Sequence, residues 1–215
     1  MSGVALDGLL IEAEKPAEVA AFWSRALGGE TTRLLDGSVR VSGPFPELTI
    51  YPQARSKSVK NRVHLDLYVR SLDRLLSMGA QILDEFRPMR VTLADIEGNE
   101  FCAFLDPDAP HDPPARVFAV CTDSDRPEEL ASWWARLVGA QVGDGSDGTP
   151  RWLRGSAGWP NLIWKFVRVS DQRVVPNRWR WTVRADTADL VAAGATVAAS
   201  GVLLDPQGNE FSVTE

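Results

Sequence analysis

The chain has 215 residues, 44% hydrophobic and 24% charged, which is enough apolar material for one large or two small cores. Its net charge of −6, with no run of lysines and arginines, argues against a nucleic-acid or membrane-surface partner. The first residues form neither a basic leader nor a long apolar core, and no apolar run approaches the roughly 18 residues of a spanning helix. We therefore expect a cytoplasmic protein in which Cys102 and Cys121 are free thiols.

The first half begins with a predicted strand and helix. Residues 9–14 read as a strand, and Pro16 suits the first turn of the following helix because its fixed φ and missing N–H cost nothing there. Apolar side chains at helical spacing continue the helix until Gly28 and Gly29 end it. Three short strands are expected next, around 30–34, 38–42 and 47–52.

Residues 61–69 alternate strictly between apolar and polar side chains, which is typical of a half-buried strand. The polar face carries Arg62, His64, Asp66 and Tyr68. Because His64 is one of only two histidines, titrating or metal-binding chemistry is expected to involve this strand. A helix over 71–78 and strands near Gln81, Met89 and Phe101 are predicted to follow.

The second half repeats the first. Residues 16–28 (PAEVAAFWSRALG) return as 127–139 (PEELASWWARLVG), and 95–101 (DIEGNEF) return as 205–211 (DPQGNEF). Strands are expected over 117–122, 162–167, 177–184 and 210–214, and helices over 127–138 and 187–193. The proline-rich stretch between the copies suits neither helix nor central strand. The predicted domains are therefore 1–107 and 115–215, joined by a linker over 108–114.

These elements predict an α+β fold of four βαβββ modules, two per domain. We expect curved mixed sheets with helices outside, so that the polar face of each sheet is left to line a pocket. The sequence leaves open whether the pockets form within one copy or between modules of the two copies. It also leaves open whether the chain is a monomeric pseudo-dimer or a homodimer.

Ordered motifs make the chain resemble the vicinal oxygen chelate superfamily, and within it the glyoxalase-like and bleomycin-resistance-like domains. The motifs are Phe22-Trp23 with Gly28, Asn61-Arg62 with His64-Leu65-Asp66, and 95–102, followed by Trp133-Trp134 with Gly139, Asn177-Arg178 and 205–211. The resemblance covers nearly the whole chain and implies two tandem glyoxalase-like domains.

The resemblance also implies where a divalent metal would be held, because family enzymes use four residues from the first and last strands of the modules. These places fall near Gly8 and Thr49, at His64 and Cys102, near Ala119 and Ile163, and at Arg180 and Ser212. A catalytic metal needs about three protein ligands, and a fixed positive charge at Arg180 would repel it. We therefore expect no metal cofactor; the alternative is a divalent metal on His64 with Cys102 or Glu100.

The candidate catalytic residues are His64 and Asp66, with Asp66 orienting His64 as a general base or polar anchor. The alternative is a histidine that is merely hydrogen-bonded within its sheet. For Cys102 we favour simple packing, and the repeated Asn-Arg pairs are interpreted as structural. The candidate ligand-binding residues are Glu12, Thr49, Tyr51, Tyr68, Cys102, Trp152, Trp159, Lys165, Arg180 and Arg184.

The basic members of this set, Lys165, Arg180 and Arg184, predict an anionic ligand, unless they pair with acids of the other domain. Trp152 and Trp159 lie in Gly/Pro-rich surroundings and predict stacking on a planar ligand, whereas other tryptophans such as Trp179 and Trp181 are expected to face the helices.

The expected function is binding of a small molecule in cupped-sheet pockets without a catalytic metal. The alternative is a lyase, isomerase or dioxygenase with one active site in the first domain, centred on His64. A third reading is a regulatory or assembly partner that uses the second domain as a surface.

Overall fold

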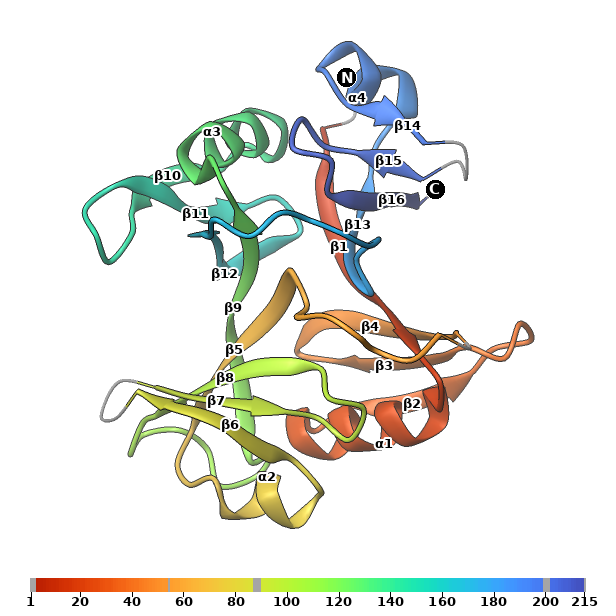
Figure 1. Cartoon of the computed structure of the whole chain (residues 1–215), viewed down its shortest axis with the longest axis vertical. Helices are drawn as coiled ribbons and strands as arrows, with labels where there is room; N and C mark the ends of the chain where they lie inside the picture. Colours follow the sequence, from red (N-terminus) through yellow and green to blue (C-terminus); the bar gives the residue numbers. More distant parts are fainter. Residues whose placement is uncertain (1–2, 54, 87–89, 199–201, 215) are drawn as a thin grey trace.

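The computed structural model describes residues 3–53, 55–86, 90–198 and 202–214. Within these residues the strands form two curved, eight-stranded mixed sheets with four helices (Figure 1). The first sheet, sheet A, has the order β14 (Thr196–Val197), β15 (Leu203–Leu204), β16 (Glu210–Thr214), β13 (Trp179–Arg184), β1 (Ala5–Ala13), β4 (Phe45–Pro52), β3 (Val39–Gly43) and β2 (Glu30–Arg33).

The second sheet, sheet B, carries the strand that includes His64. Its order is β10 (Gln141–Asp144), β11 (Pro150–Ser156), β12 (Trp159–Arg168), β9 (Ala115–Ser124), β5 (Val63–Val69), β8 (Glu100–Leu105), β7 (Arg90–Ala94) and β6 (Gln81–Phe86). The predicted α+β fold of four βαβββ modules is confirmed.

Each sheet joins one module from each half of the chain. In sheet A, β1 pairs antiparallel with β13 and places Leu10 opposite Arg180. In sheet B, β5 pairs antiparallel with β9 and places His64 opposite Cys121. Each concave face therefore combines residues of both sequence copies, which answers a question that the sequence had left open.

The longer helices follow the predicted bounds. α1 (Pro16–Leu27) and α3 (Pro127–Val138) begin at prolines and end at Gly28 and Gly139, whose φ values of 70° and 64° are left-handed and favour glycine. α2 (Asp73–Ser77) and α4 (Thr187–Ala192) are shorter than expected. The hairpin of β10 and β11 was not predicted, and Met89 lies outside the described residues.

Tryptophans fill the core between helices and sheets. Trp23 on α1 lies 5.6 Å from Trp179 on β13, and Trp134 on α3 lies 5.5 Å from Trp181, measured between ring centroids. The repeated DxxGNE motif holds the helices in place, because Trp23 donates its indole N–H to Asp95 at 3.1 Å. The helices thus cover the apolar faces of the sheets and leave the polar, concave faces available. No described helix has the length and apolar character to cross a membrane.

Candidate functional site

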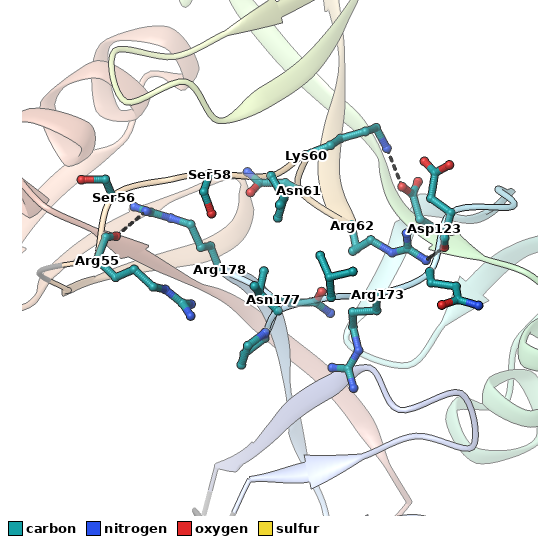
Figure 2. Close-up of a pocket in the computed structure, with 16 residues that line it drawn as sticks. Arg55, Ser56, Ser58, Lys60, Asn61, Arg62, Asp123, Arg173, Asn177 and Arg178 are labelled. Atoms are coloured by element: carbon teal, nitrogen blue, oxygen red, sulfur yellow. Dashed lines mark hydrogen bonds and ion pairs between the residues drawn. The ribbon is translucent and has the colours of Figure 1, made fainter.

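Two kinds of candidate site are present. One is the concave face of sheet B, which carries the polar side chains of β5. The other is a pair of cavities, of about 140 Å³ and 300 Å³, along the linkers 55–62 and 169–178; Figure 2 shows the first of them. We take the sheet face as the candidate for chemistry because it alone concentrates histidine, cysteine, lysine and carboxylate side chains at close range among the described residues.

Strand register builds the sheet-B cluster. The alternation in β5 places His64 and Asp66 on one face, and the pairing sets Asp66 beside Cys102 on β8 and His64 beside Cys121 on β9. On the far side of β9, β12 places Lys165 beside Cys121. Four adjacent strands therefore present their polar side chains to one point.

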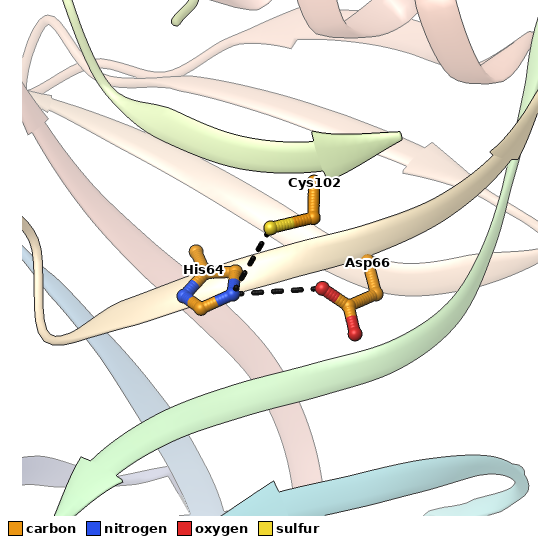
Figure 3. Close-up of side chains that lie close together, drawn as sticks. All are labelled: His64, Asp66 and Cys102. Carbon is orange, nitrogen blue, oxygen red and sulfur yellow. Dashed lines mark hydrogen bonds and ion pairs between the residues drawn. The ribbon is translucent and has the colours of Figure 1, made fainter. Parts of the chain in front are cut away.

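Asp66 is at the centre of this cluster. Its Oδ2 accepts a hydrogen bond from Lys165 Nζ at 2.8 Å, and its Oδ1 lies 3.5 Å from His64 Nε2. The same His64 nitrogen lies 3.8 Å from Cys102 Sγ (Figure 3). Asp66 is 4% exposed and Lys165 8%, so this is a buried ion pair with a histidine alongside.

The charges in the cluster stabilise one another. Burial by itself disfavours ionised Asp66, but His64 and Lys165 outweigh it and lower the pKa of Asp66 to about 2. Burial also disfavours a charged imidazole, yet the polar groups around the ring hold the pKa of His64 well above its ordinary value. Burial raises the pKa of Cys121 to about 12, so its thiol is neutral and we assign the effect on His64 to Asp66. The resting cluster therefore holds two cations and one carboxylate.

Aromatic rings surround the Lys165 ammonium. Its Nζ lies 4.4 Å from the ring centroid of Phe118, 5.0 Å from Trp152 and 5.3 Å from Phe104. Tyr68 stacks on Phe118 with centroids 3.9 Å apart. These four rings are only partly buried, so they offer apolar faces to a ligand next to a desolvated cation.

A divalent metal does not fit this donor set. His64, Asp66 and Cys102 place one ligand atom each within 4.8 Å of one another. However, the Asp66 carboxylate already bonds to Lys165 and His64, and the raised pKa of His64 keeps a proton on the ring that a metal would have to displace. A fixed ammonium 2.8 Å from one ligand oxygen would also repel the ion.

The equivalent face of sheet A is occupied by ion pairs. Arg180 donates to Glu12 at 2.9 Å, and Glu12 also lies 3.8 Å from Arg55. Arg184 lies 3.8 Å from Asp7 in a solvent-exposed pair. Arg180 and Arg184, like Lys165 with Asp66, pair with acids of the first copy, which was the alternative to an anion-binding role.

The structure sorts the predicted site residues into two groups. His64, Asp66, Tyr68, Cys102, Trp152 and Lys165 come together on sheet B, whereas Glu12, Thr49, Tyr51, Arg180 and Arg184 lie on sheet A. Glu100 is outside the cluster because its carboxylate accepts hydrogen bonds from Lys57 Nζ and from the backbone N–H of Asn61. For Trp159 the structure corrects our expectation that this residue lies in a loop and stacks on a ligand. It is 3% exposed on β12, with its indole bonded to Asp7 O, so it is not available for stacking.

Phe104, Phe118 and Cys121 were missed. Phe104 lies two residues after Cys102, so alternation along β8 could have found it. Phe118 lies where the β5–β9 register shifts, between Asp66 and Leu67, and period-2 counting along the sequence misplaces it.

Comparison with known proteins agrees with this architecture. The family model of the glyoxalase-like domain matches residues 4–104 and 119–214. None of the curated proteins compared with the chain matches it. Similar solved structures are only 12–14% identical to the chain, so their similarity shows a shared fold and nothing more.

Glyoxalase I from Zea mays aligns with a TM-score of 0.67 at 12% identity, covering 97% of this chain and 91% of that one. A mutant of glyoxalase I from the same organism aligns with a TM-score of 0.65 at 12% identity, covering 98% and 93%. A putative dioxygenase from Bacillus subtilis aligns with a TM-score of 0.63 at 14% identity, covering 98% and 84%. With the family model matched in both halves, the chain belongs to the glyoxalase-like domain family of the vicinal oxygen chelate superfamily.

Proposed function

We propose that the protein binds a small planar anion on the concave face of sheet B, without a catalytic metal. The observation that carries this proposal is the Lys165 ammonium, which lies between the Asp66 carboxylate and three aromatic rings. A lysine in this position supplies the positive charge that a metal would otherwise supply, and it leaves the donor set unsuitable for one.

The rings and the cations recognise different parts of the ligand. A planar group stacks on Trp152, and its acidic group accepts from the Lys165 ammonium and from protonated His64. Asp66 holds both cations in place and neutralises one of their two positive charges, which leaves one positive charge for the acidic group of the ligand. Cys102 and Cys121 are free thiols, which suits the reducing conditions of the cytoplasm.

The test is calorimetric titration of EDTA-treated protein with 2-naphthoate and its neutral analogue 2-naphthamide. We expect naphthoate to bind without added metal, and naphthamide to bind at least about tenfold more weakly because the charge-assisted hydrogen bonds are lost. Trp152→Leu should weaken naphthoate binding by roughly fivefold through lost stacking, while Arg180→Gln on sheet A serves as the matched control. Binding that requires Zn²⁺ or Ni²⁺, or that treats acid and amide alike, would refute the proposal.

A second candidate is an enzyme of the lyase or isomerase type. The arrangement of His64 beside Asp66 and Cys102 favours it, because a histidine with a raised pKa suits a general acid at neutral pH. Turnover of a carbonyl-containing substrate that is abolished in His64→Asn, with naphthoate binding weakened but not lost because Lys165 remains, would favour this function over simple binding.

A further inference from the structure

The two Asn-Arg pairs place equivalent arginines at the two ends of the paired linkers. Arg178 donates to the carbonyl of Arg55 at 2.8 Å, and Arg62 donates to the carbonyl of Asp171 at 2.9 Å. Each arginine therefore reaches across to the opposite linker in the same way. Figure 2 shows Arg178 next to Arg55 at one end and Arg62 next to Asp123 at the other.

At one end of the linkers, the guanidinium of Arg178 forms an ion pair with the carboxylate of Glu97. Arg178 Nη2 lies 3.2 Å from Glu97 Oε2, with the two side chains 6% and 11% exposed. The backbone N–H groups of Glu14 and Lys15, just before α1, donate to the same carboxylate at 3.0 and 2.6 Å. A buried guanidinium and two amides thus form a complete carboxylate-binding site, filled by the chain itself.

In the other half this carboxylate is missing. Gln207 has the position of Glu97 in the repeated motif, and its amide bonds instead to Ser124 Oγ at 2.6 Å and to Arg126 O at 2.8 Å. Within the described part of the chain, Arg62 has no carboxylate at ion-pair distance, and its buried Nε has no hydrogen-bond partner. A guanidinium with one unsatisfied buried nitrogen and no carboxylate partner is stabilised when an anion binds to its accessible N–H groups.

The cavity of about 300 Å³ lies at this unpaired guanidinium, lined in part by Arg62, Ser124, Ser170, Gln172, Arg173 and Gln207. Its volume is at the lower end of the roughly 300–1,000 Å³ found for small-molecule sites. Asp123, Asp125 and Asp171 also line it, so a dianion such as phosphate or sulfate would be repelled, whereas a single carboxylate directed at Arg62 would not meet the same penalty.

We propose that Arg62 and this cavity form a second binding site, for a small monocarboxylate whose acid group takes the place that Glu97 fills in the other half. The carboxylate accepts from the terminal guanidinium N–H groups of Arg62, as Glu97 accepts from Arg178 Nη2 in the other half, and the rest of the molecule occupies the cavity. This site is separate from the concave face of sheet B and does not depend on the planar-anion proposal.

The internal repeat supplies matched variants for the test. Sodium acetate and butyrate are titrated by calorimetry and in thermal melts at constant ionic strength, with acetamide as the neutral isostere and sulfate as the dianion. Gln207→Glu should fill the site from within, raising Tm by a few degrees without ligand and weakening acetate binding at least about tenfold. Arg62→Gln should also lose acetate binding.

Glu97→Gln is the reciprocal control. It should lower Tm and open a second acetate site at Arg178, seen as a larger acetate-dependent rise in Tm than in the wild type. The proposal is overturned if the wild type gives no saturable heat with acetate or butyrate, or if acetamide or sulfate binds as well as acetate. It is also overturned if Gln207→Glu leaves acetate binding unchanged.

Discussion

Replacing Lys165 with methionine tests the account of the sheet-B cluster directly. The substitution keeps most of the side-chain volume and removes the charge that lies 2.8 Å from Asp66 Oδ2. Removing one partner of a buried ion pair costs about 3–5 kcal/mol, because the other charge is left unpaired. His64 remains 3.5 Å from the same carboxylate and compensates in part, so we expect the lower end, about 3 kcal/mol.

A loss of this size corresponds to a fall in Tm of roughly 6–12 °C for a chain of this length. The assay is urea unfolding, in which the midpoint should fall while the slope m stays constant. The double variant Asp66→Asn/Lys165→Met leaves no unpaired charge on either partner and should recover most of the loss. Stability of Lys165→Met within about 1 kcal/mol of the wild type, or a double variant no more stable than the single one, would refute the reasoning.

The same substitution also tests the argument about metals. Without the resident ammonium, the donor set His64, Asp66 and Cys102 no longer faces a fixed cation, so Zn²⁺ should raise the Tm of Lys165→Met but not that of the wild type. An equal Zn²⁺-dependent rise in both proteins would show that Lys165 does not exclude a metal.

Three further predictions concern stability. Because the pKa of Asp66 is about 2 in the folded state and about 3.9 unfolded, its ionised form contributes roughly 2–3 kcal/mol above pH 4, lost as the pH falls towards 2. The raised pKa of His64 gives the opposite pH dependence of stability: the contribution of the protonated imidazole is complete below pH 6.5 and is lost as the pH rises through the pKa of the folded state. The urea midpoints of His64→Asn should therefore lack this decline at alkaline pH. In the core, Trp134→Ala should cost about 3–5 kcal/mol, whereas Val191→Ala, at a side chain 44% exposed, should stay within about 0.5 kcal/mol. A pH-independent difference between His64→Asn and the wild type, or a small effect of Trp134→Ala, would contradict these accounts.

Local sequence patterns were sufficient to predict the modules. Proline and glycine mark the ends of α1 and α3 because their backbone preferences act within a few residues. Alternation within 61–69 placed His64 and Asp66 on one face of β5, and the repeat predicted the α+β fold of four modules. The inward-facing Trp179 and Trp181 follow from the same two-residue period.

The pairing of strands across the two halves was decided only in the tertiary structure. Lys165 and Asp66 are 99 residues apart, and their contact depends on β9 lying between β5 and β12, for which no short stretch carries a signal. The same is true of Arg62, because the motif shows Gln207 in place of Glu97 but not that an arginine from the other half faces this position. Dihedral preferences act along the chain, whereas charge pairing and cavities depend on which distant strands lie side by side.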